Sequence, residues 1–409
     1  MSLRFGAQEA SRYVYLDYAA TAPLCEEAAA AMAPYFVPGR ENLAAGGNAN
    51  SLHSPGREAF SQMEAARKAL AGAIGAKRAQ EVVFTSGATE ADCAAIEGLA
   101  QAQVEKRHMR LGSASAPMVV VSAIEHDAVL APAKRLEAQG YRVVRLAPNA
   151  QGVVEPEALS AAITPETVLV SVQLANSEAG SIQPVGQLAR IAHSAGAVFH
   201  TDATQALGKM PLNVQELGVD AASFSAHKVG GPKGIGALYL KARTPFSAFM
   251  LGGGQEGGLR SGTQNVAGMA GFAAAAQAAC SMADAEAARL AALRDKVYAA
   301  AAGMRGVRAT VPEASGNAGY LPNIVHLLVQ GIESETLILQ LDKAGFGVSG
   351  GSACSSHSLE PSHVLSAMGI PADAALGALR VSMGRYTTEN DVDAFLRALP
   401  DVLDWGRGR

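Results

Sequence analysis

Between about residue 80 and residue 240 the sequence alternates short β-rich runs with stretches typical of helices. The runs expected to form strands are 81–85, 119–122, 168–172, 197–201, 221–224 and 236–240. Strands that alternate with helices predict an α/β domain with a mainly parallel sheet. In such sheets ligands bind where the strands end, so the residues after each run are the first candidates for a site.

Five polar residues directly follow these predicted strands. They are Ser86, His126, Asp202, Ser225 and Lys228. Because the carboxyl ends of parallel strands meet at one edge of a sheet, we expect these side chains to share a site. A lone histidine is more often structural than functional, but one beside a cofactor ring can stack on it and carry protons.

Asp202 and Lys228 together indicate pyridoxal phosphate (PLP), which needs a carboxylate for its pyridine nitrogen and a lysine for a Schiff base. A free lysine has a pKa of about 10.4, so burial must suppress its charge. Lys228 alone could also be a surface residue that closes a loop, since Gly230, Gly231 and Pro232 follow it. A buried Asp202 could instead pair with a backbone or helix-cap donor.

The segment Ser86–Glu90 opens a helix after a strand. Exposed backbone N–H groups and the helix dipole suit a phosphate there, and Thr89 adds a hydroxyl. The same residues also match an ordinary N-cap signature. No Walker A motif is present, because the glycine–lysine pattern at 231–236 has the wrong spacing.

Two further residues suit sulfur and amino-acid chemistry. Cys354 is surrounded by small and polar residues from Ser349 to Ser358, whereas a core cysteine usually has apolar neighbours. We therefore expect an exposed thiol on a mobile loop, which suits nucleophilic attack, with an incidental free thiol as the alternative. Arg380 lies in the alternating run 379–383, where it could bind a carboxylate of an amino acid or form a salt bridge within the sheet.

Composition limits the remaining possibilities. A chain of 409 residues can form two domains, and its net charge of −4 argues against nucleic acid as the main partner. We expect no membrane span and no signal peptide, because no long apolar run is present. Cys25, Cys93, Cys280 and Cys354 show no C-x-x-C spacing, so we expect no metal site, no disulfide framework and a reduced, cytoplasmic protein.

Taken together, these motifs resemble those of the cysteine desulfurases of the NifS/IscS type, which are fold-type I, class V aminotransferase-like enzymes. The resemblance runs from Tyr15 to Thr388. Its specific motifs are 84–90, 202–205, 225–228 and 260–263, and the most discriminating is 349–362 around Cys354. That long segment resembles the NifS/IscS group rather than the SufS group, whose cysteine lies in a shorter and more ordered segment.

The resemblance implies a role for each matching residue in holding PLP. Lys228 would carry the cofactor as a Schiff base, Asp202 would pair with its pyridine nitrogen, and His126 would stack on its ring. Gln205 would contact the phenolic oxygen. The residues that would hold the phosphate are Ala88, Thr89, Ser225 and His227, with Thr263 reaching the phosphate of the neighbouring subunit of an obligate homodimer.

For the substrate, the resemblance implies that Arg380 binds the carboxylate and that Cys354 accepts the sulfur. The sequence departs from the family at two positions. Ser177 stands where a second asparagine usually helps to orient the ring and the substrate, and the shorter serine would need a water molecule to bridge the gap. Gly257 stands where relatives commonly have a larger, often basic residue, which could loosen the loop before Arg260.

The sequence therefore predicts a homodimeric, PLP-dependent enzyme that converts L-cysteine to L-alanine and passes the sulfur to Cys354 as a persulfide. The acceptor would be an iron–sulfur scaffold or a tRNA or cofactor thiolation protein. The expected fold is PLP fold type I, with a large domain at 15–262 around a mainly parallel seven-stranded sheet. A smaller α+β domain, 1–14 and 263–409, would carry the cysteine loop. The alternatives are another class V enzyme, namely a selenocysteine lyase, β-lyase or aminotransferase, and a non-catalytic scaffold.

Overall fold

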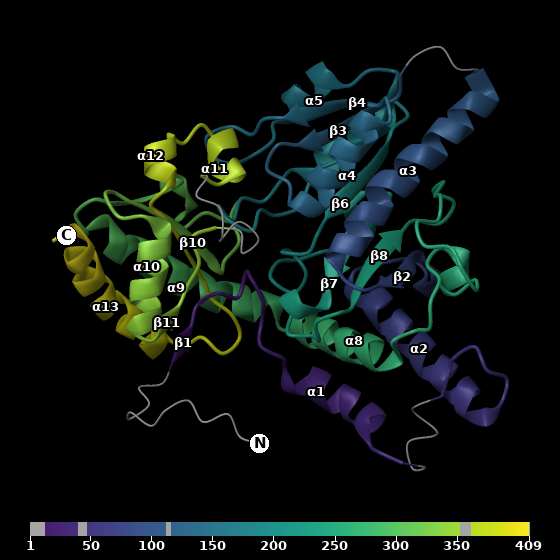
Figure 1. Ribbon diagram of the computed structural model, residues 1–409, viewed down its shortest axis with the longest axis horizontal. Coiled ribbons are helices and arrows are strands. Elements are labelled where there is room, and N and C mark those ends of the chain that lie inside the picture. Colours follow the sequence, from purple (N-terminus) through teal and green to yellow (C-terminus); the bar gives the residue numbers. More distant parts are fainter. Residues whose placement is uncertain (1–12, 40–46, 112–115, 352–360, 409) are drawn as a thin grey trace. The chain divides into compact units, whose positions relative to one another are not determined.

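The structure is a computed structural model that describes residues 13–39, 47–111, 116–351 and 361–408 (Figure 1). The chain divides into two compact units. Unit 1 comprises Met1–Ala20, Ser177–Gly180 and Ala288–Arg409, and unit 2 comprises Thr21–Asn176 and Ser181–Ala287. The domain boundaries expected from the sequence stay a prediction.

Unit 2 is built on a seven-stranded sheet within the described residues, in the order β2-β8-β7-β6-β5-β3-β4. The strands are β2 (Val82–Thr85), β3 (Met118–Ser122), β4 (Arg142–Leu146), β5 (Thr167–Ser171), β6 (Val198–Asp202), β7 (Ala221–Ser225) and β8 (Gly236–Leu240). The pairs β4–β3, β3–β5, β5–β6 and β6–β7 are parallel, whereas β8 runs antiparallel to both β7 and β2. The predicted strands and the mainly parallel sheet are therefore confirmed.

Two groups of helices cover this sheet, which explains why β5, β6 and β7 are buried along their whole length. Helix α3 (Ala88–Leu111) packs along β5 to β8, and α4 (Asp127–Ala138) packs on α3, β3 and β4 (Figure 1). The second group contacts β4, β5 and β6 and contains α5 (Pro156–Ala162), α6 (Val185–Ser194) and α7 (Val214–Leu217). The core between α3, α4 and the sheet consists of alanine, valine, leucine and isoleucine side chains.

The alanine-rich stretch near 268–301 forms two helices, as predicted. Helix α8 (Val266–Ser281) packs closely on α1 (Glu26–Met32) and α2 (Ser54–Ala73). Gly271 allows this approach, since a Cβ atom there would lie 2.6 Å from the sulfur of Met32. No single described helix is long and apolar enough to cross a membrane; α8 and α9 (Ala283–Ala302) reach that length and composition only as a pair bent by 70°.

Unit 1 contains an antiparallel sheet in the order β12-β10-β9 and a parallel pair, β1 with β11. The strands are β1 (Val14–Tyr15), β9 (Val307–Ala309), β10 (Ile324–Val329), β11 (Phe346–Gly347) and β12 (Ala378–Ser382). Helix α10 (Ser334–Lys343) packs on α13 (Glu389–Arg407), β11 and β12, while α11 (His363–Ala367) contacts α12 (Ala372–Ala375). The smaller α+β part of the predicted fold is thus observed.

A buried ion pair fastens the loop before α8 to the sheet of unit 2. Both guanidinium Nη atoms of Arg67 on α2 donate to the carboxylate of Glu256, at 2.6 and 2.8 Å. The backbone N–H of Phe84 donates to the same carboxylate at 2.8 Å. Glu256 has a φ of 51°, which is unfavourable for a residue with a side chain, so these three hydrogen bonds offset backbone strain.

We expect Arg67→Ala to lower the free energy of unfolding by about 3–5 kcal/mol, because it leaves the Glu256 carboxylate buried without its cation. Urea denaturation of the purified protein would measure the change. Lys68→Ala, at the exposed neighbouring position, is the matched control and should change the value by no more than about 0.5 kcal/mol. A loss of less than about 1 kcal/mol in Arg67→Ala would show that the pair does not anchor the loop.

Candidate active site

The residues predicted from the sequence follow strands whose carboxyl ends lie at one edge of the sheet. Since β8 is antiparallel to both of its neighbours, β2 runs parallel to β7 and ends at the same edge. Gly236, at the start of β8, pairs with Thr85 on one side and Ser225 on the other. A Cβ atom at Gly236 would lie 2.5 Å from the backbone of Gly87, so only glycine lets the turn after β2 pack there.

This turn leads directly into the 24 residues of α3. The hydroxyl of Thr85 donates to the carbonyl of Gly87 at 2.9 Å, and the N–H of Ser86 donates to the carboxylate of Glu90 at 2.8 Å. Burial favours a raised pKa for Glu90, but hydrogen bonds from Arg260 and Ser86 outweigh it and lower the pKa. The first-turn N–H groups of a helix have no acceptor within the helix, so Ala88 and the exposed Thr89 present donors suited to an anion.

Positive charge gathers where β7 ends. Ser225 is the last residue of β7, and His227 and Lys228 lie in the short 3₁₀ turn that follows, both half-buried. Burial, and then the positive charges of Lys228, Lys209 and Lys233, lower the pKa of His227 to about 4. His227 is therefore a neutral imidazole among three cations, which is an environment that favours a phosphate dianion.

Asp202 ends β6 and is buried, as expected from the apolar run before it. Its Oδ1 accepts the N–H of Thr204 at 2.9 Å. Gln205 is also buried, and its side-chain oxygen accepts a hydrogen bond from Lys209 at 2.8 Å. The hydroxyl oxygen of Thr204 is buried and makes no hydrogen bond within the described part of the chain, so a polar group beside Asp202 lacks a partner.

His126 is half-buried and forms the N-cap of α4. The backbone N–H of Ala128 donates to its Nδ1 at 3.1 Å. This hydrogen bond fixes the orientation of the ring at the start of α4.

A buried polar chain that the sequence analysis missed lies beside Asp202. His200 lies two residues earlier on β6, so both side chains point to the same face of the sheet. Its ring nitrogens lie 2.8 Å from Oγ of Ser171 and 2.9 Å from Oγ of Ser223, and its Nε2 is 3.6 Å from a carboxyl oxygen of Asp92. The signal was available, because polar residues stand at alternating positions within otherwise apolar strands.

The charges of this chain are settled by burial. Burial lowers the pKa of His200 to about 3, so the ring is neutral and its contact with Asp92 is not an ion pair. Burial and the nearby Asp202 raise the pKa of Asp92 well above its ordinary value, against a hydrogen bond from Ser223. The surroundings therefore disfavour the charged form of both His200 and Asp92.

The loop that precedes α8 carries Thr263, which is exposed. Arg260 in the same loop makes a two-pronged ion pair with Glu90, at 2.8 and 3.2 Å. Gly257 has a φ of 65°, in the left-handed region that favours glycine, so the departure at this position suits the local backbone. The ion pair with Glu90 therefore holds Arg260 in place, even though Gly257 was expected to loosen the loop before it.

Unit 1 contains the other two described candidates, Arg380 and Ser177. Arg380 on β12 is fully buried, and its Nη atoms donate to the carbonyl of Ser177 at 2.9 Å and to the carboxylate of Asp17 at 2.8 Å. Its Nε is buried and makes no hydrogen bond to the described residues. His326 on β10 lies opposite Arg380 in the sheet. Burial, and then the charge of Arg380, lower the pKa of His326 to about 3. The ion pair with Asp17 balances the charge of the Arg380 guanidinium.

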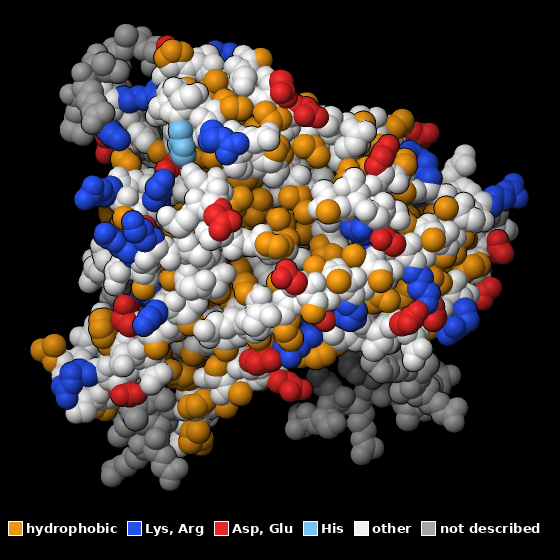
Figure 2. Space-filling model, turned by 180° about the vertical axis from the view of Figure 1, so that it is seen from behind, with side chains coloured by type: hydrophobic (Ala, Val, Ile, Leu, Met, Phe, Trp, Pro, Cys, Tyr) orange, Lys and Arg blue, Asp and Glu red, His pale blue; other side chains and the backbone are white. Residues whose placement is uncertain are grey.

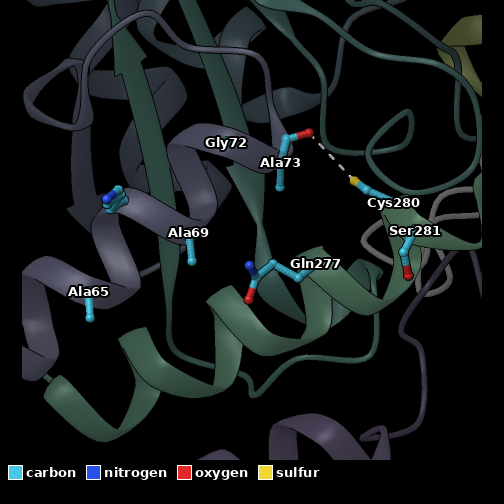
Figure 3. Close-up of a pocket in the computed structure, with 8 residues that line it drawn as sticks. Ala65, Ala69, Gly72, Ala73, Gln277, Cys280 and Ser281 are labelled. Atoms are coloured by element: carbon cyan, nitrogen blue, oxygen red, sulfur yellow. Dashed lines mark hydrogen bonds between the residues drawn. The ribbon is translucent and has the colours of Figure 1, made fainter.

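Cys354 lies outside the described residues, which resume at Pro361. The other cysteines are free thiols in or beside helices. Cys280 lines the groove of about 630 Å³ between α2 and α8 and donates to the carbonyl of Ala73 at 3.6 Å (Figure 3). Burial raises its pKa, which makes the thiol unreactive, and none of the predicted site residues lines this groove.

Comparison with known proteins identifies the family of this chain. The sequence model of the family described as "Aminotransferase class-V" matches residues 14–395. Cysteine desulfurase IscS of Dictyoglomus turgidum is 42% identical over 397 residues, which cover 96% of this chain and 95% of the relative. A solved "NIFS-LIKE PROTEIN" is 34% identical with a TM-score of 0.85, covering 96% of this chain and all of that one. The structure described as "SspA in complex with cysteine" is 29% identical with a TM-score of 0.76, covering 92% and 100%.

The chain therefore belongs to the class V aminotransferase family, whose members use PLP. Within that family it belongs to the cysteine desulfurases of the IscS/NifS type, which are PLP-dependent enzymes, and its α/β fold with a mixed seven-stranded sheet is theirs.

Acid should weaken the contribution that a buried neutral histidine makes to the stability. His200 takes up a proton below about pH 6.5 in the unfolded chain but only near pH 3 in the folded one, so the contribution of His200 to the stability falls as the pH drops below 6.5. We expect His200→Asn to remove about 2 kcal/mol of the stability lost between pH 7 and pH 5, measured by urea unfolding. Ser223→Ala, which removes a partner but no titrating group, should keep the full dependence; an equal flattening in both variants would contradict this assignment.

Proposed function

We propose that this cysteine desulfurase binds PLP at the carboxyl edge of the unit 2 sheet. The observation that carries the proposal is that β6 and β7, adjacent and parallel, end at a buried carboxylate, Asp202, and at the turn that contains Lys228. Asp202 would hold the pyridine nitrogen and Lys228 would bind the aldehyde carbon.

The donors at this edge fit the rest of the cofactor. Neutral His227 amid three lysines, together with Ser225 and the start of α3 at Ala88 and Thr89, suits the phosphate. His126 would stack on the ring, and Gln205 would contact the phenolic oxygen. The buried hydroxyl of Thr204, which makes no hydrogen bond to the described residues, is a further donor beside Asp202. We also propose that Thr263 reaches the phosphate of a second copy in a homodimer.

When bound, PLP draws electron density away from Cα of the amino acid, which lets that carbon lose its proton. Lys228 Nζ would take the Cα proton and return a proton later, while Asp202 holds the opposite side of the ring. Cys354 Sγ would attack the sulfur of L-cysteine, breaking its bond to Cβ. The balance is one L-cysteine and one Cys354 thiol converted to one L-alanine and one Cys354 persulfide.

Arg380 would bind the carboxylate of the substrate. A guanidinium with one anion, Asp17, and a buried Nε that makes no hydrogen bond to the described residues retains capacity for a second anionic partner. Ser177, where the family resemblance implies an asparagine, holds Arg380 through its backbone carbonyl, and its shorter side chain would reach substrate through water. The relative described with bound cysteine supports this substrate class.

The persulfide would pass to a sulfur-acceptor protein, of which an iron–sulfur scaffold or a thiolation protein is the expected kind. A reducing compartment, the cytoplasm, suits a chain whose three described cysteines are all free thiols. On the face shown in Figure 2, acidic and basic side chains are interspersed with apolar ones, which fits a protein partner better than nucleic acid.

Incubation of the purified, PLP-loaded protein with L-cysteine and a dithiol tests the proposal. We expect equal amounts of alanine and sulfide. Amine transfer to an added oxo acid, with little sulfide, would show an aminotransferase instead, and release of selenide alone from selenocysteine would show a selenocysteine lyase. A colourless protein that cannot be loaded with PLP would contradict the proposed cofactor.

Cys354→Ala should keep the yellow colour and lose all cysteine-dependent persulfide on the protein, because no other thiol suits attack on the substrate. Mass spectrometry after thiol labelling without a reductant would detect the persulfide. Cys280→Ala, which removes a half-buried thiol, is the matched control and should form persulfide at the normal level. Normal persulfide formation in Cys354→Ala would overturn the role of Cys354.

A further inference from the structure

A fully buried acid fastens the turn before His126 to the neighbouring strand. Glu125 Oε1 lies 2.6 Å from Oγ of Ser122, the last residue of β3, and accepts the backbone N–H of Gln173 at 2.8 Å. Gln173 follows β5, which pairs with β3 in parallel. The carboxyl group therefore bridges the ends of two adjacent strands.

The backbone next to Glu125 is held by the same neighbour. The carbonyl of Ile124 accepts hydrogen bonds from the side-chain amides of Gln173 and Asn176, the latter at 3.2 Å. His126 follows directly, and the N–H of Ala128 binds its Nδ1. The ring is thus placed between a docked turn on one side and the start of α4 on the other.

Glu125 also belongs to a set of three interacting buried carboxyl groups, with Asp92 on α3 and Asp202 at the end of β6. Burial, reinforced by Asp202, raises the pKa of Glu125 to about 8 despite the hydrogen bonds from Ser122 and Gln173. Burial and Asp202 also raise the pKa of Asp92 well above its ordinary value. Like charges in a low-dielectric region repel strongly, so a second carboxylate beside Asp202 is disfavoured.

We propose that Glu125 is a positioning residue, which docks the His126 turn onto the end of β5. The proposal rests on the proposed function, in which His126 and Asp202 hold the cofactor. It differs from a merely structural role, because it requires the carboxyl group to be protonated in the working enzyme.

The first test uses the cofactor-free chain, so its result does not depend on the proposed activity. Between about pH 5 and pH 8 Glu125 is protonated when folded and ionised when unfolded, so the contribution of Glu125 to the stability falls as the pH rises. In this pH range Glu125 makes the unfolding constant of the wild type rise by an extra factor of about ten per pH unit. Glu125→Gln should lack this extra rise. Ser122→Ala keeps the titrating group and should retain the wild-type steepness.

The second test uses the loaded enzyme. Glu125→Gln can make the same hydrogen bonds without a charge, so its kcat at pH 7 should fall by at most about threefold. In the variant, the alkaline loss of kcat and of the cofactor's visible spectrum should begin at a higher pH than in the wild type. Glu125→Ala undocks the turn and should lower kcat by about tenfold to a hundredfold with little change in KM.

Three results would overturn the proposal. One is an unchanged pH dependence of unfolding in Glu125→Gln. Another is an alkaline limit at the wild-type pH in that variant, which decides the matter even if Glu125→Ala does not fold. The third is a loss of kcat in Glu125→Gln as large as in Glu125→Ala. Absence of cysteine desulfuration by the wild type would count against the proposed function instead, and the unfolding test would still stand.

Discussion

Parallel hydrogen bonding among β3, β5, β6 and β7 is the constraint on which the candidate site depends. Each parallel strand must return through a helix, so successive strands end at the same edge and release their next residues there. The side chains of His126, Asp202 and Ser225 reach that edge because of this topology, although they are far apart in the sequence. The antiparallel β8 completes the arrangement, since it lets β2 run with the others while Gly236 leaves room for the turn before α3.

The electrostatics of unit 2 follow from the difference between carboxyl groups that are buried and lysines that are not. Water-free surroundings raise the pKa of both Asp92 and Glu125, because an unpaired charge there would be costly. Where β7 ends, half-buried and exposed lysines surround a neutral His227 and produce a positive region. A cofactor with a cationic ring nitrogen and an anionic phosphate matches this separation of charge, with Asp202 at one end and the lysines at the other.

The strands, the main helices and the mixed α/β class could be predicted, because apolar runs bounded by polar residues are local properties of the chain. Asp202, Lys228 and the start of α3 were also accessible, since each follows a strand that the pattern indicates. The buried pair Arg67–Glu256 was not, because its partners are 189 residues apart and neither stands in an apolar run. Arg380 was placed on a strand correctly, but its ion pair with Asp17, 363 residues away, has no local signature.

The sequence by itself determined the order and type of the elements and the chemistry that its strand-end residues can support. Only the tertiary structure decided which acids have a raised pKa, how the start of α4 holds the His126 ring, and that Glu125 bridges two strand ends. The physical reason is that a pattern of apolar residues records which side chains leave water, whereas protonation depends on which groups they then meet. Burial and neighbours set those states, and both arise only when distant segments pack together.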